Sequence, residues 1–215
     1  RRHTRYIGDW SSDVCSSDLY MFYSCYSLQT VPLFNTAAVT DISFMFYSCY
    51  SLQTVPLFNT AAVTNISGMF VNCYSLQTVP LFNTAAVTNM SYMFQNCYSL
   101  QTVPLFNTAA VTNISGMFVN CYSLQAVPSL NVSAVTSSSN FSSMFSGCRS
   151  LIRIQASRFN YTFSVASCKL SATALNEIYT NLPTVTGQTI TVTGNWGTAT
   201  DTPSIATAKG WTVTG

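Results

Sequence analysis

The sequence predicts an α/β fold, a right-handed solenoid of stacked coils that each contain a short helix and a short parallel strand. The first observation is a repeat of 24 residues, since MFYSCYSLQTVPLFNTAAVTNISG at 45–68 recurs almost unchanged at 21–44, 69–92 and 93–116. The second is that an apolar stripe with helical spacing precedes an alternating stretch in each copy. A fixed period of about 20–50 residues is typical of solenoids, whose units bury their apolar faces on one another.

The chain divides into three segments, 1–19, 20–151 and 152–215. The repeats degenerate from Met117 onward, and a sixth copy begins at Met144 and diverges after Leu151. Residues 1–19 share nothing with the repeat and resemble a translated sequencing adapter, so we expect a disordered, non-biological stretch. A natural disordered tail is the alternative. The adapter interpretation leaves open whether a signal peptide or further repeats precede Tyr20.

The first half of each coil is expected to form a helix of about two turns. In the second coil its apolar residues fall at steps of three and four, at Val39, Ile42, Met45, Phe46 and Cys49. This is the spacing of one helix face. Thr40 or Asp41 can cap the start of the helix through a side-chain oxygen.

The second half of each coil is expected to form a short parallel strand. Its period of two points Val55 and Leu57 inward and Thr54, Pro56 and Phe58 outward. Pro56 and its equivalents have no N–H to give to a neighbouring strand. We therefore expect short strands that lack one ladder bond per coil.

The repeated pattern MFxxCxSLxxVPLFNTxxVTNxS resembles the bacterial BspA-like leucine-rich-repeat surface proteins over about residues 21–151. The resemblance implies a leucine-rich-repeat-like solenoid in a cell-surface or secreted protein that mediates adhesion. Similar arrays on phage tail fibres make a phage virion the alternative location. The asparagine of the leucine-rich pattern is displaced by one residue, and Thr60 occupies its slot. An inner ladder of asparagines is still expected, at Asn35, Asn59, Asn83 and Asn107.

Six cysteines occupy one equivalent position of the repeat, at Cys25, Cys49, Cys73, Cys97, Cys121 and Cys148. Free thiols buried as small hydrophobic groups are one interpretation. Disulfides between neighbouring coils are another, because stacked coils bring equivalent Cα atoms to about 4.8 Å. A zinc site is disfavoured, because His3 in the first segment is the single histidine and no C-x-x-C occurs.

The C-terminal segment is expected to cap the solenoid with helix, strand, helix and strand. Ser171 can cap a helix over 172–182, which Pro183 ends. A strand over 188–193 follows, then a short helix over 203–209 that Gly210 ends and a strand over 211–214. Basic residues also appear here, at Arg149, Arg153, Arg158 and Lys169, and the three arginines either form a patch or lie on a solvated face.

Composition argues against several functions. Charged residues make up 7% of the chain, and Asp41 is the single charge between Tyr20 and Cys148. Nucleic-acid binding is not expected, because it relies on Lys and Arg contacts to phosphates. No apolar run approaches the roughly 20 residues of a membrane span. Outside the first segment the acids are far apart and no histidine occurs, so neither an enzyme nor a cofactor or metal site is expected.

The outward rows of the repeat are the candidate binding face. Uncharged aromatic rows can bind sugars by stacking or proteins by apolar contact. We therefore predict adhesion to an unidentified host-surface protein or glycan. A structural spacer, or a receptor-binding segment of a phage tail fibre, is the alternative, and rows that only stack on themselves would fit it. The candidate residues are Thr54, Pro56, Phe58, Thr78, Pro80, Phe82, Thr102, Pro104, Phe106, Tyr50, Tyr74 and Tyr98.

Overall fold

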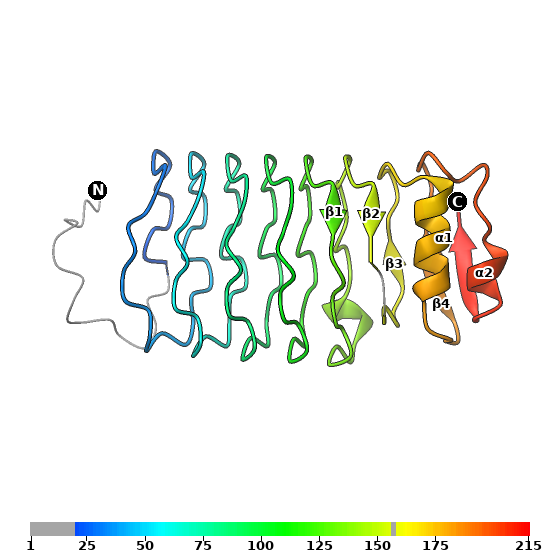
Figure 1. Ribbon diagram of the computed structural model, residues 1–215, viewed down its shortest axis with the longest axis horizontal. Coiled ribbons are helices and arrows are strands. Elements are labelled where there is room, and N and C mark those ends of the chain that lie inside the picture. The colour runs from blue at the N-terminus through cyan, green and yellow to red at the C-terminus, as the bar shows by residue number, and fades with distance from the viewer. Residues whose placement is uncertain (1–19, 156–157) are drawn as a thin grey trace.

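The computed structural model describes residues 20–155 and 158–215, and the chain forms an elongated stack of coils from the N-terminal to the C-terminal end (Figure 1). Residues 24 apart lie side by side, since Asp41 pairs with Asn65, Asn65 with Asn89 and Asn89 with Asn113 in parallel. Each coil therefore corresponds to one copy of the repeat. The expectation of a disordered tail over 1–19 lies outside the described residues.

The helix predicted for the first half of each coil is wrong. Residues 43–48 form consecutive turns, and Phe44 and Ser48 have φ values of +54° and +58°. Left-handed residues at that spacing exclude an α-helix. The N–H of Met45 bonds the carbonyl of Ile42, while the N–H of Phe46 bonds that of Met69 in the next coil. The spacing of three and four found in the sequence thus comes from successive turns, each of which points one apolar side chain inward.

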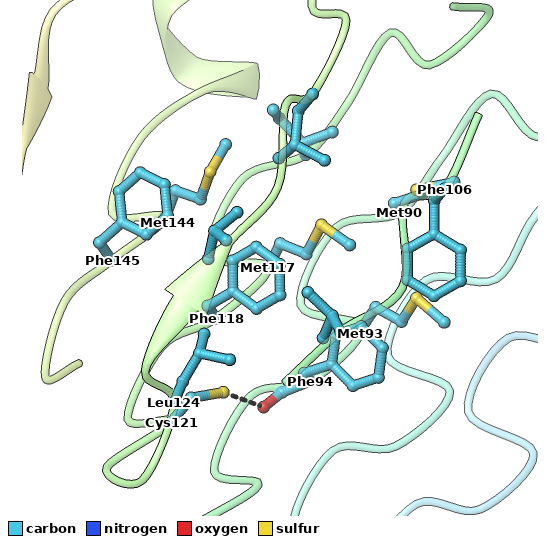
Figure 2. Close-up of a cluster of buried hydrophobic side chains, with 14 of the residues drawn as sticks. Met90, Met93, Phe94, Phe106, Met117, Phe118, Cys121, Leu124, Met144 and Phe145 are labelled. Atoms are coloured by element: carbon cyan, nitrogen blue, oxygen red, sulfur yellow. Dashed lines mark hydrogen bonds between the residues drawn. The ribbon is translucent and has the colours of Figure 1, made fainter. Parts of the chain in front are cut away.

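The interior of the stack is a set of side-chain columns that run along its axis. Phe46, Phe70, Phe94 and Phe118 stack with centroid distances of 5.6–5.8 Å. Figure 2 shows Phe94 and Phe118 of this column, with methionines and Leu124 beside them. Equivalent valines are also buried in every coil, at Val31, Val55, Val79 and Val103. A coil has no closed core of its own, so its stability comes from burial against its neighbours.

The cysteines form a column of free thiols. Five of these thiols donate a hydrogen bond to a main-chain carbonyl of the preceding coil, as Cys97 does to Phe70 at 3.1 Å. Cys49, Cys73, Cys121 and Cys148 make the equivalent bond at 3.1–3.2 Å. The thiols therefore serve both as small apolar groups and as donors that satisfy carbonyls.

The inner polar ladder is made by threonine, and the expected asparagine ladder is wrong. Thr60 is 3% exposed and its hydroxyl donates to the carbonyl of Asn83 at 2.9 Å. Asn59 is exposed, and its side chain accepts from the N–H of Ala61 at 3.2 Å within its own turn. The hydroxyl reaches the next coil because Thr60 occupies the inward slot that the leucine-rich pattern gives to asparagine.

The second half of each coil is extended but forms fewer strand bonds than expected. One bond per coil joins the glutamines, as Gln53 N–H donates to the carbonyl of Gln29 at 3.0 Å. Paired strands begin at β1 (Ala126–Val127), which lies parallel to β2 (Arg153–Ile154). The proline of each copy removes a donor in the middle of this stretch.

The C-terminal segment continues the stack, and from α1 (Ala172–Asn181) onward its elements follow the predicted order of helix, strand, helix and strand (Figure 1). Helix α1 is capped by Ser171, whose hydroxyl accepts from the N–H of Ala174 at 3.2 Å. Three strands form a parallel sheet in the order β3-β4-β5, with β3 at Phe163–Ser164, β4 at Gln188–Thr191 and β5 at Trp211–Thr214. Helix α2 (Ser204–Thr207) lies between β4 and β5 in the sequence, and the 3-10 helix η1 (Ser138–Asn140) belongs to an earlier coil.

Candidate functional site

The predicted threonine and proline rows lie on the surface of the extended half of the coils. Thr54, Thr78 and Thr102 are exposed, and Pro56, Pro80 and Pro104 are half-buried. The structure thus leaves these six residues accessible along one side of the stack. Their role in binding stays a prediction.

The predicted phenylalanine row is wrong. Phe58, Phe82 and Phe106 are each 3% exposed and belong to the core. The cause is a tight turn at the proline, since the N–H of Phe82 bonds the carbonyl of Pro80 at 3.0 Å and that of Phe106 bonds Pro104 at 3.0 Å. A bond between residues i and i+2 closes a γ-turn, which ends the alternation of a strand. Phenylalanine therefore points inward.

A row of leucines lies outside in its place, although the sequence pattern predicted Leu57 inside. Leu33, Leu57, Leu81 and Leu105 are 68%, 58%, 57% and 61% exposed. Ser129 occupies the same position in the next coil, so the row ends there. The recurring proline was the signal for this reversal, because it marks a turn as readily as an interrupted strand.

The predicted tyrosine row forms a continuous stack. Tyr26, Tyr50, Tyr74, Tyr98 and Tyr122 have centroid distances of 4.6–4.8 Å between neighbours. Tyr74 and Tyr98 lie within 1° of parallel. A ring stacked on both faces offers only its edge and hydroxyl to a ligand. The row therefore stabilises the stack, and stacking of a sugar on Tyr50, Tyr74 or Tyr98 would require the column to open.

The same position of the repeat carries cations and a tryptophan in later coils. Arg149 lies 5.2 Å from the ring centroid of Tyr122, and Lys169 lies 5.5 Å from that of Trp196. Trp196 is 71% exposed, more than the other large apolar side chains of the described residues. Cations placed over aromatic faces gain a favourable electrostatic contact. These two cations belong to the column and not to a separate basic patch.

The remaining charges of the C-terminal segment make structural contacts. Arg153 pairs with Glu177 through bonds of 2.8 and 3.2 Å. Tyr179 donates to a carboxylate oxygen of Asp201 at 2.7 Å, and its burial, with this contact, raises the pKa of the phenol. Lys209 donates to the carbonyls of Tyr179, Thr180 and Leu182 at the end of α1. Cations at this end of a helix offset its dipole.

Two further findings concern residues 20–155 and 158–215. None of the helices there is long and apolar enough to cross a membrane. Within the same residues, His, Cys, Asp and Glu side chains do not gather in groups of three or more that could hold a metal ion.

Two overlapping stretches, residues 3–81 and 50–159, match the family described as "Mycoplasma protein of unknown function, DUF285". The chain belongs to this family. The DUF285 match spans all the clear repeats, so the columns described above lie within it. No sequence among the curated proteins matches the chain. Among solved structures, the "Crystal structure of T. pallidum Leucine Rich Repeat protein (TpLRR)" is 18% identical, with a TM-score of 0.48 and coverage of 77% of this chain and 72% of that one.

Proposed function

We propose that this DUF285 chain is a non-enzymatic, surface-exposed repeat protein that adheres to a partner protein through its leucine row. The observation that carries the proposal is the exposure of Leu33, Leu57, Leu81 and Leu105, each more than half accessible. Scattered exposed leucines are ordinary, but an apolar row repeated at one spacing resembles a protein-interaction site. The exposed threonines and half-buried prolines beside it supply polar hydroxyls and rigid backbone.

The chemistry of the row favours an uncharged mode of contact. Asp41 is the single charge between Tyr20 and Cys148, so electrostatic steering contributes little. Apolar contact and hydrogen bonds to threonine hydroxyls would carry the affinity, and binding would depend weakly on salt. The BspA-like resemblance of the repeats supports an extracellular or cell-surface location and a right-handed winding of the coils.

Binding of the labelled chain to immobilised cell-surface and extracellular-matrix proteins tests the proposal. Leu57→Ser with Leu81→Ser should abolish adhesion and leave folding intact, because Ser129 already occupies this position in the fifth coil. A matched control is Ala61→Ser with Ala85→Ser, which changes two exposed residues of another turn. Adhesion that survives the leucine changes, or that disappears at high salt, would contradict the proposal.

A structural spacer, as in a phage tail fibre, is the second candidate. The tyrosine stack favours this candidate, because the five rings pack face to face along the solenoid and stiffen it. Virion genes beside the gene of this chain would support the spacer, while a cell-wall anchor would support the adhesin. In a spacer, the leucine changes leave adhesion of the whole virion unaltered.

A further inference from the structure

A second aromatic row of the repeat is interrupted by glycine. Its positions in the first five described coils are Tyr20, Phe44, Gly68, Tyr92 and Gly116. All of them have φ between +54° and +67°. Because glycines interrupt this row, space remains between its rings. The unbroken tyrosine stack has no such space.

The ring of Phe44 fills part of the space that Gly68 leaves. A Cβ atom on Gly68 would lie 2.3 Å from Cε1 of Phe44. The next ring along the row, Tyr92, is 44% exposed. Among the described residues Tyr92 has no aromatic neighbour, since the stacked ring pairs of this row end with Tyr20 and Phe44 at 5.9 Å. The face of Tyr92 is thus available to a ligand.

A hollow of about 240 Å³ opens between these rings. Phe44 and Tyr92 line it together with the buried Val71 and the amides of Asn72, Gln95 and Asn96. Its volume lies below the roughly 300–1,000 Å³ typical of sites for drug-sized ligands. An occupant the size of one sugar ring therefore matches it better than a larger ligand.

The amides beneath the hollow are held in fixed orientations. Asn96 donates to Asn72 at 2.7 Å, and Asn72 donates to the hydroxyl of Ser48 at 3.1 Å. This ladder uses one N–H of each amide, and every primary amide has a second. The Gln95 amide has no hydrogen-bond partner within the part of the chain that the structure describes. Preorganised donors and acceptors of this kind suit the hydroxyl groups of a ligand.

We propose that this hollow binds one ring of a neutral glycan. The C–H face of a pyranose packs against Tyr92, while its hydroxyls bond the amides of Gln95 and Asn96. No charged side chain lines the hollow, so an acidic sugar gains nothing from its charge there. An aromatic side chain of a peptide would cover the amides without bonding them, which is costly. This site is separate from the leucine row and independent of the function proposed above.

Saturation-transfer NMR of the full chain with neutral methyl hexopyranosides and N-acetylhexosamines tests the proposal. Tyr92→Gly and Gln95→Val should each weaken binding about tenfold. Both changes copy residues of equivalent positions, Gly68 and Val71, so the fold has already accommodated them. Leu57→Ser is the matched control and should leave sugar binding unchanged, which separates this site from the leucine row.

Three results would overturn the proposal. The first is the absence of saturation transfer from every neutral sugar. The second is wild-type affinity in both Tyr92→Gly and Gln95→Val. The third is selective binding of sialylated or sulfated glycans that Arg149→Tyr abolishes, because that result would assign the ligand to the cation beside Tyr122.

Discussion

The thiol of Cys121 donates a hydrogen bond to the carbonyl oxygen of Phe94 at 3.1 Å, as the dashed line in Figure 2 shows. Cys49, Cys73, Cys97 and Cys148 make the equivalent bond. Each thiol must therefore keep its proton for the column to stay satisfied. Burial away from water also raises the pKa of these thiols, and that of Cys49 rises from 9.0 to about 12.

The raised pKa of the thiols predicts a loss of stability in alkali. Below pH 9.0, the ordinary thiol pKa, Cys49 is protonated in both states. Between that value and about 12, only the unfolded chain ionises, so each such thiol lowers the free energy of unfolding by up to about 1.4 kcal/mol per pH unit. Urea unfolding followed by circular dichroism should give a shallower alkaline slope for Cys49→Ala than for wild type. Parallel slopes would show that the thiol ionises equally in both states.

Replacing Thr84 by valine should destabilise the stack by about 1–2 kcal/mol. The Thr84 hydroxyl donates to the carbonyl of Asn107 at 2.8 Å, and valine keeps the shape while removing the donor. Thr78→Val is the matched control, because Thr78 is exposed and its change should stay within about 0.5 kcal/mol. Chemical denaturation measures both variants, and equal losses would refute the inner threonine ladder.

Gly116 and Tyr92 should be strongly coupled. A Cβ atom on Gly116 would lie 2.3 Å from Cε1 of Tyr92, and Gly116 has a φ of +60°. Gly116→Ala therefore adds a clash to the roughly 1–2 kcal/mol cost of a left-handed alanine. In a Tyr92→Gly background only the conformational cost should remain. A double-mutant cycle measures the difference, and additive effects would contradict this contact.

The architecture could be predicted from the repeat alone, because a 24-residue period requires side-by-side stacking of equivalent residues. The cap could be predicted because its signals are local, such as Ser171 before α1 and Pro183 after it. The consecutive turns in the first half of each coil could not be predicted. The apolar residues Val39, Ile42, Met45 and Cys49 have the same spacing in successive turns as they would have on a helix face. The residue types of Phe44 and Ser48 did not indicate a left-handed backbone, because phenylalanine and serine are not typical of that conformation.

The candidate face was predicted only in part for a related reason. Thr54 and Pro56 precede the turn at the proline, so the period of two places them correctly on the surface. Leu57 and Phe58 follow the proline and have the opposite directions, as in the next coil, where a γ-turn at Pro80 ends the alternation. The hollow beside Tyr92 depends on side-chain contacts between residues far apart in the sequence, and no local pattern encodes them.

The exposed leucine row and the proposed adhesion both depend on the directions of Leu57 and Phe58, which thiol labelling can measure. Leu57→Cys and Phe58→Cys would be compared in a Cys15→Ser, Cys25→Ser background, in which the other native cysteines are buried. Burial and raised pKa values should keep those native thiols unreactive in the folded chain. We predict that the cysteine at 57 reacts rapidly with a maleimide while the one at 58 is protected until unfolding. Protection at 57 with rapid labelling at 58 would show that residue 57 is buried and residue 58 exposed, the reverse of the arrangement described above.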